Sequence, residues 1–105
     1  MPATTAPNVP LPPGAEYADP WGAVDSDPRQ YRVINGATRS VEGNSDVEVW
    51  TAAVQYDDGT LDQDALDRPN VWIQAHQEGL SSAQARELAA ALLSAADELD
   101  GWTRR

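Results

Sequence analysis

The segment from Leu80 to Trp102 constrains the fold of this 105-residue chain most strongly, because it holds a helix start, an apolar stripe and a helix stop. Ser81 is a favoured N-cap residue, and Gln84 three positions later completes a capping box. Gly101 suits the left-handed position that ends many helices. We therefore predict one amphipathic helix over this segment. Its apolar stripe is formed by Ala85, Leu88, Ala89, Leu92, Ala96 and Leu99, with Leu93 at the flank.

The position of this stripe also predicts which helix residues lie on the opposite, polar side. Glu98 falls with Glu87 and Asp97 on the polar side, where we expect it to face water. Trp102 lies just beyond Gly101 and is expected to pack back onto Ala96.

Two segments before the helix read as strands. Residues 46–56 alternate over a length typical of a strand, and residues 70–77 form a shorter one after Pro69, which suits a strand's first position. The longer strand is apolar on both faces, unlike a sheet with one wet side. One face holds Val47, Val49, Thr51 and Ala53, and the other holds Trp50, Ala52, Val54 and Tyr56.

The turn signals organise the rest of the sheet. Asn35-Gly36 lies between short runs of strand formers, and this dipeptide is the strongest short hairpin signal, so we predict a hairpin there. Residues 42–45 and 57–59 read as further turns. Residues 60–62 are a candidate for a short additional strand.

The N-terminal region has a different composition, because seven of the eight prolines lie in residues 1–28. Proline removes a backbone donor and restricts the residue before it, so we predict a largely disordered Pro-rich tail over 1–28. A Pro-rich docking ligand is the less favoured interpretation. Tyr17 and Trp21 are candidates to anchor the tail's end. The remaining residues, 29–105, are predicted to form a single α+β domain, a small antiparallel meander of three to five strands packed by one C-terminal α-helix.

Charge excludes several functions. The chain carries 17 acidic and 7 basic residues, a formal charge of −10. Duplex binding draws its affinity from phosphate neutralisation, so no direct nucleic-acid binding is expected. No run approaches the roughly 20 apolar residues of a membrane helix, and the start lacks the features of a secretory signal. We expect a cytoplasmic protein.

Candidate chemistry is sparse. His76 is the only histidine, no cysteine is present, and no ligand spacing surrounds His76, so it reads as a surface residue at a strand end. The acidic cluster does not match a calcium loop and reads as solvated; it comprises Asp57, Asp58, Asp62, Asp64 and Asp67. Helix capping explains Ser81. We predict no catalytic residue, no cofactor and no metal.

The balance of apolar faces predicts an interface. One helix covers one face of a sheet, whereas the strands present two apolar faces. The second face would exceed the few hundred Å² typical of a monomer's largest apolar patch. The candidate interface is Trp50, Val54, Tyr56 and Trp72. Its cover is the segment around Tyr17 and Trp21, a second copy of the chain, or a different protein.

The helix residues 85–93, ARELAAALL, and 95–98, AADE, resemble the C-terminal helix of short uncharacterised actinobacterial and mycobacteriophage proteins. The segments 54–60, VQYDDGT, and 71–73, VWI, are similar to strands in such proteins. The resemblance implies a strand–strand–helix unit and no chemistry.

Three functions follow in order of preference. The first is a non-enzymatic protein-interaction or regulatory module, a homodimer with an acidic surface. The alternative is an acidic phage or accessory inhibitor that mimics nucleic acid. The least favoured is a small enzyme or metal-binding protein that uses His76.

Overall fold

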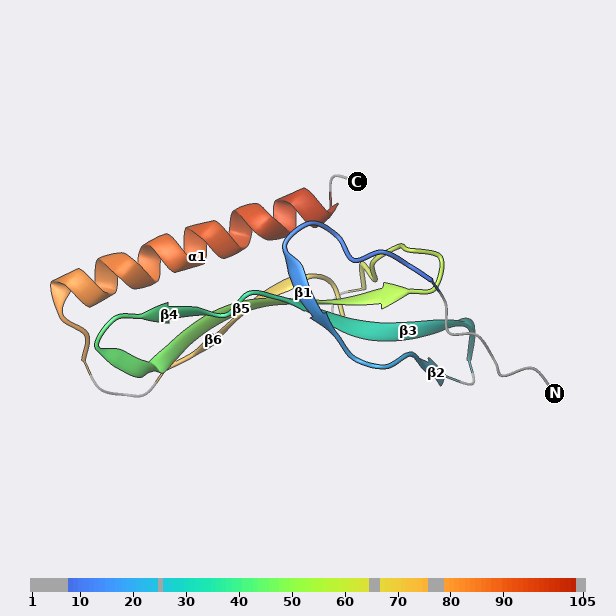
Figure 1. The fold of residues 1–105 in the computed structure, drawn as a ribbon, viewed down its shortest axis with the longest axis horizontal. Coiled ribbons are helices and arrows are strands. Elements are labelled where there is room, and N and C mark those ends of the chain that lie inside the picture. The colour runs from blue at the N-terminus through green and yellow to red at the C-terminus, as the bar shows by residue number, and fades with distance from the viewer. Residues whose placement is uncertain (1–7, 25, 65–66, 76–78, 104–105) are drawn as a thin grey trace.

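The computed structural model describes residues 8–24, 26–64, 67–75 and 79–103. Helix α1 lies along one face of a long, curled antiparallel sheet (Figure 1). The predicted α+β class, with one C-terminal helix packed on an antiparallel sheet, is confirmed. Within these ranges the elements are β1 (Ala15–Ala18), β2 (Gly22–Val24), β3 (Asp27–Gly36), β4 (Arg39–Val41), β5 (Asn44–Tyr56), β6 (Asn70–Gln74) and α1 (Ser82–Thr103).

The strands form a meander around β5. Val49 of β5 pairs with both β4 and β6, and Ala52 pairs with both β3 and β6. Because a strand has two edges, β3 and β4 follow each other along one edge of β5, and β6 occupies the other. β1 and β2 likewise follow each other along β3. The described sheet has six strands rather than three to five. The count rises because β1 and β2 are separate strands along one edge of β3, and β3 and β4 are separate strands along one edge of β5.

The predicted disorder of residues 1–28 is wrong for residues 15–24, which form β1 and β2 at the outer edge of the sheet. Pro20 lies in the gap between these strands, where a missing donor breaks no ladder bond. Asp19 keeps the line in register, because its N–H donates to the Val33 carbonyl at 2.9 Å. The folded domain therefore begins well before residue 29.

Residues 9–13 are also held on the fold, because proline removes donors but leaves carbonyl acceptors. Side chains of the domain supply the donors in place of a β-ladder. Arg32 Nη2 donates to the Val9 carbonyl at 2.8 Å, Gln55 Nε2 to the Pro10 carbonyl at 3.1 Å, and Trp102 Nε1 to the Pro13 carbonyl at 2.7 Å. Side-chain donors of the domain therefore hold residues 9–13 against the fold.

The hairpin predicted at Asn35-Gly36 is wrong. Asn35 pairs with Tyr17 of β1 and Ala52 of β5, so the dipeptide lies inside the sheet. Neither residue has the positive φ that the hairpin turn requires. The chain turns between β4 and β5 instead, within the second predicted turn, where Gly43 has φ 77°. The turn at residues 57–59 is confirmed, with φ 89° at Gly59.

The capping box is confirmed at the start of α1. The Gln84 N–H donates to Ser81 Oγ, and the Ser81 N–H donates to Gln84 Oε1, both at 3.1 Å. The predicted stop at Gly101 is wrong, because α1 continues to Thr103. Because the helix continues past Gly101, Trp102 packs between α1 and the sheet, and its burial favours the added helical residues.

The predicted apolar stripe of α1 is right for Leu88, Leu92 and Leu99, which are half-buried, and wrong for its alanines, which are exposed. Ala95 and Trp102, seven positions apart, are the buried helix residues, whereas the predicted stripe members Ala89 and Ala96 are exposed. Leu93 is 69% exposed. The core lies between this face of α1 and the side of β5 that carries Val47, Val49, Thr51 and Ala53. Trp102 packs there against Ile34 and Ala53 rather than on Ala96.

Candidate functional site

In the part of the chain that the structure describes, the sheet face opposite α1 carries no helix (Figure 1). Along β5 the burial alternates: every second residue from Val47 to Gln55 is buried against the helix side, and the residues between are half-buried. Residues opposite each other on paired strands share a face. The register therefore assigns to this face, which we call the open face, Tyr17, Tyr31, Val33, Asn35, Trp50, Ala52, Val54, Tyr56 and Trp72.

The register places all four predicted interface residues on this open face and brings Trp50 and Trp72 into direct contact range. Trp50 pairs directly with Trp72 across β5 and β6, and Val54 pairs with Val33 across β5 and β3. Trp72 is 51% exposed and Tyr17 is 57% exposed. A hollow of about 160 Å³ runs beside Val54 and Trp72. Large aromatic side chains at the surface of a sheet are typical of contact surfaces.

Residues 8–24, the described part of the N-terminal segment, do not cover the open face, although the sequence left this open. β1 and β2 widen the sheet instead of crossing it. Trp21 packs under the guanidinium of Arg32, whose Cζ lies 4.4 Å from the ring centroid. Arg32 bonds Gln55, a residue of the helix side, so Trp21 anchors there. Tyr17 stays largely exposed.

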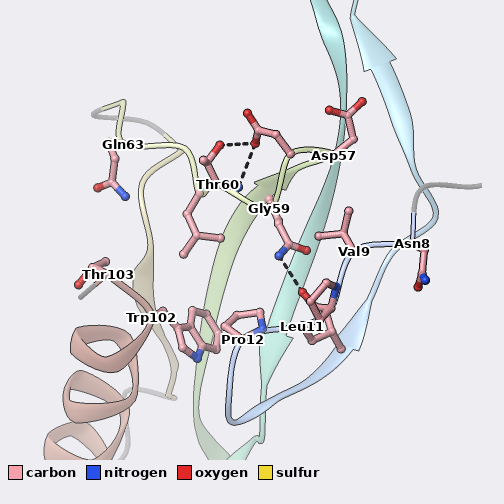
Figure 2. Close-up of a pocket in the computed structure, with 14 residues that line it drawn as sticks. Asn8, Val9, Leu11, Pro12, Asp57, Gly59, Thr60, Gln63, Trp102 and Thr103 are labelled. Atoms are coloured by element: carbon pink, nitrogen blue, oxygen red, sulfur yellow. Dashed lines mark hydrogen bonds between the residues drawn. The ribbon is translucent and has the colours of Figure 1, made fainter. Parts of the chain in front are cut away.

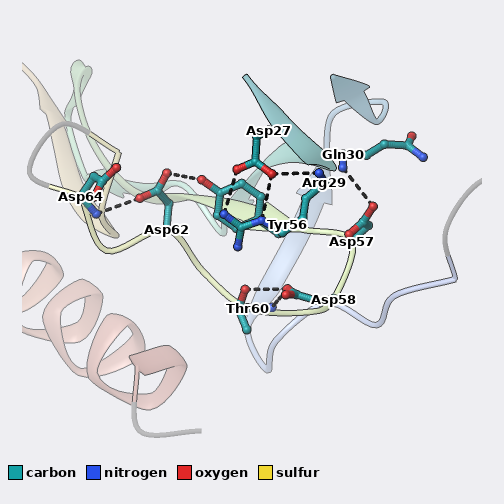
Figure 3. Close-up of polar contacts among 9 residues, drawn as sticks. All are labelled: Asp27, Arg29, Gln30, Tyr56, Asp57, Asp58, Thr60, Asp62 and Asp64. Carbon is teal, nitrogen blue, oxygen red and sulfur yellow. Dashed lines mark hydrogen bonds and ion pairs between the residues drawn. The ribbon is translucent and has the colours of Figure 1, made fainter. Parts of the chain in front are cut away.

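Tyr56 lies apart from the other predicted interface residues, because a polar cluster closes its end of the open face (Figure 3). Arg29 Cζ lies 3.7 Å from the centroid of the Tyr56 ring, and Asp27 holds that guanidinium through an ion pair of 2.9 Å. The Tyr56 hydroxyl donates to Asp62 Oδ2 at 2.6 Å. Tyr56 is therefore held in place at the edge of the open face by Arg29 and Asp62.

The Tyr56–Asp62 hydrogen bond shifts the pKa of both groups, so that Tyr56 stays protonated and Asp62 stays ionised over a wider pH range. It raises the pKa of Tyr56 to about 12, and it lowers the pKa of Asp62. The tyrosine contribution to stability is complete below the unfolded pKa of roughly 10 and is lost as the pH rises through about 12. The Asp62 contribution is present above its unfolded pKa and is lost as the pH falls below it.

Titration of the tyrosinate absorbance should therefore show Tyr56 ionising about two units above an ordinary tyrosine, near 12. Tyr56→Phe should delete this late step. Asp62→Asn should move the step toward lower pH, because it removes the hydrogen bond to a carboxylate and also the neighbouring negative charge. A late step that survives Tyr56→Phe would contradict the assignment.

A hollow of about 690 Å³ lies between residues 8–12, the turn after β5 and the end of α1 (Figure 2). Both carboxylates of this hollow accept hydrogen bonds from backbone N–H groups. Asp57 accepts from the Gln30 N–H at 2.9 Å, and Asp58 accepts from the Thr60 N–H at 3.0 Å. The Thr60 hydroxyl also donates to Asp58 at 2.5 Å, and these acids stabilise the turn.

The remaining candidates for chemistry do not form a site among the described residues. Within those ranges, no group of three or more acids or histidines has the geometry to hold a metal ion. Asp62 and Asp58, two members of the acidic cluster, bond Tyr56 and Thr60 instead. Ser81 caps α1. His76 lies outside the residues that the structure describes.

Sequence reasoning missed a partly buried polar cluster between α1 and the sheet. Glu98 faces the sheet rather than water: Arg39 Nη2 donates to its Oε2 at 2.7 Å, and the Thr51 hydroxyl donates to its Oε1 at 2.9 Å. The Gly36 N–H donates to the same hydroxyl at 3.0 Å. Arg39 and Glu98 lie 59 positions apart, so no local pattern could pair them.

None of the described helical sequence is both long and apolar enough to cross a bilayer. Searches of curated proteins and of solved structures found no match to the chain. The family model "Domain of unknown function (DUF6907)" matches residues 2–105. This match covers almost the whole sequence, so the chain belongs to that family.

Proposed function

We propose that this family member is a non-enzymatic interaction module of the cytoplasm, whose open face binds protein and which forms a homodimer. The observation that supports this most strongly is the exposed aromatic surface opposite α1. Trp72 and Tyr17 each leave about half of their surface in water, beside the partly exposed Trp50. Burying such groups contributes roughly 25 cal/mol per Å² of apolar surface removed from water.

A substitution at Trp72 tests this surface. In sedimentation velocity at micromolar concentration, Trp72→Glu should shift the protein from dimer to monomer, because it removes the aromatic contact and adds a charge to the interface. Leu93→Glu is the matched control: it adds the same charge at the exposed side of α1 and should leave the dimer intact. Equal sedimentation of wild type and Trp72→Glu, with both folded by circular dichroism, would contradict the proposal.

Salt dependence separates this function from the alternative, an acidic inhibitor that mimics nucleic acid. Two copies that each carry −10 repel one another, so self-association should strengthen when salt rises from 0.05 to about 0.5 M. Binding to a basic partner should weaken over the same range. Self-association that weakens with salt would argue against the homodimer.

A further inference from the structure

β6 forms an edge of the sheet, because among the described residues it pairs with β5 alone. The direction of its backbone groups follows from the neighbouring bridge between Gln55 and Leu61. There the Tyr56 N–H donates to the Thr60 carbonyl and the Val54 carbonyl accepts from the Asp62 N–H. Gln55 pairs with β3 on its other edge, so even-numbered residues of β5 point their backbone groups toward β6.

This alternation assigns the free groups of β6. Trp72 lies opposite Trp50, an even-numbered residue, so its N–H and C=O point toward β5. The N–H and C=O groups of Val71 and Ile73 therefore point away from the sheet. These groups form a template for another strand.

The β6 edge lacks the devices that usually protect an edge. Its residues, NVWIQ, contain no charge and no proline. The opposite edge of the sheet contains Glu16, Asp19 and Pro20, which discourage pairing there. Side chains on both faces of β6 are open to solvent as well: Trp72 on the open face is 51% exposed, and Ile73 on the helix side is 49% exposed.

We propose that β6 pairs antiparallel with β6 of a second copy, centred on Trp72, so that the two sheets join into one. This inference rests on the proposed function and names its partner and geometry. Trp72 is the middle residue of the strand, so this register overlaps all of β6. Val71 of each copy then exchanges both backbone hydrogen bonds with Ile73 of the other, and the two Trp72 side chains lie side by side.

Charge favours a second copy as the occupant. A chain of net charge −10 can approach its own copy closely only where the contact itself is uncharged, and β6 is such a stretch. A two-fold axis through Trp72 makes the contact self-complementary and closes it at two copies. A basic partner would instead be drawn to the acidic surface elsewhere.

Cysteine cross-linking tests the register, since the natural chain has no cysteine. Opposed residues in a non-hydrogen-bonded antiparallel pair have Cα atoms about 4.5 Å apart, within disulfide range. Under mild oxidation Trp72→Cys should convert mostly to covalent dimer, at least ten times faster than the exposed control Leu93→Cys. Equal rates for the two variants would overturn the proposed register.

A proline substitution tests the hydrogen bonds. Ile73→Pro removes an outward donor without breaking the ladder to β5, and it should give a monomer that keeps its circular dichroism spectrum. Ile73→Ala keeps the donor and should remain dimeric. A dimeric Ile73→Pro with a monomeric Trp72→Glu would overturn edge pairing and leave the interaction surface standing. If Trp72→Glu is dimeric too, the proposed function also fails.

Discussion

Trp102→Ala should lower the free energy of unfolding by about 3–5 kcal/mol, the usual cost of truncating a large buried aromatic residue. Trp102 is 3% exposed and packs against Ile34 and Ala53 in the core. Its Nε1 also donates to the Pro13 carbonyl, so the substitution should release the Pro-rich segment as well. Urea unfolding measures the first effect, and the rate of proteolysis within residues 8–13 measures the second.

Trp102→Phe separates the two contributions, because it keeps most of the apolar burial and deletes the N–H donor. We expect a smaller loss of stability than with Ala, together with faster proteolysis of the N-terminal segment. The role assigned to Trp102 would be wrong if Trp102→Ala unfolded within about 1 kcal/mol of the wild type, since core truncations cost more than this.

Gly36→Ala should cost about 2–4 kcal/mol, which is large for the addition of one methyl group. A Cβ atom at Gly36 would collide with Glu98 Oε1 and Thr51 Oγ1, the acceptor and the donor of one partly buried hydrogen bond. To relieve the collision, the Glu98 carboxylate must move away from Arg39, which breaks their ion pair. Chemical denaturation of the two proteins measures the difference.

Gly101→Ala is the matched control for that substitution. Nothing lies within 4 Å of a Cβ at Gly101, which is exposed within α1. Removing glycine from a helix should stabilise the fold by up to about 1 kcal/mol. Equal effects of the two glycine substitutions would contradict the cluster. The cost of Gly36→Ala should also shrink in a Glu98→Ala background, because the colliding carboxylate is absent.

Features governed by neighbours in the sequence were predictable. The capping box needs only Ser81 and Gln84, and the turn at Gly59 needs only its own residue types. The alternating pattern of residues 46–56 correctly indicated a strand. Trp50 and Trp72 could be placed on the open face by alternation alone, although their direct pairing could not.

Features governed by distant partners were not predictable. The rotation of α1 about its axis depends on the contacts of Trp102 with Ile34 and of Glu98 with Arg39. Both contacts join residues far apart in the sequence, so no local sequence pattern indicates them. Asn35-Gly36 has the composition of a turn, but pairing on both sides keeps it extended. Proline composition predicted disorder where side-chain donors hold the carbonyls of residues 9–13.

Light scattering on the unmodified full chain tests the proposed interaction surface most directly. At tens of micromolar protein and moderate salt, we predict a molar mass of twice the 11.3 kDa of one chain, falling toward the single-chain value on dilution. A mass of 11.3 kDa that stays constant across the whole concentration range would contradict the homodimer.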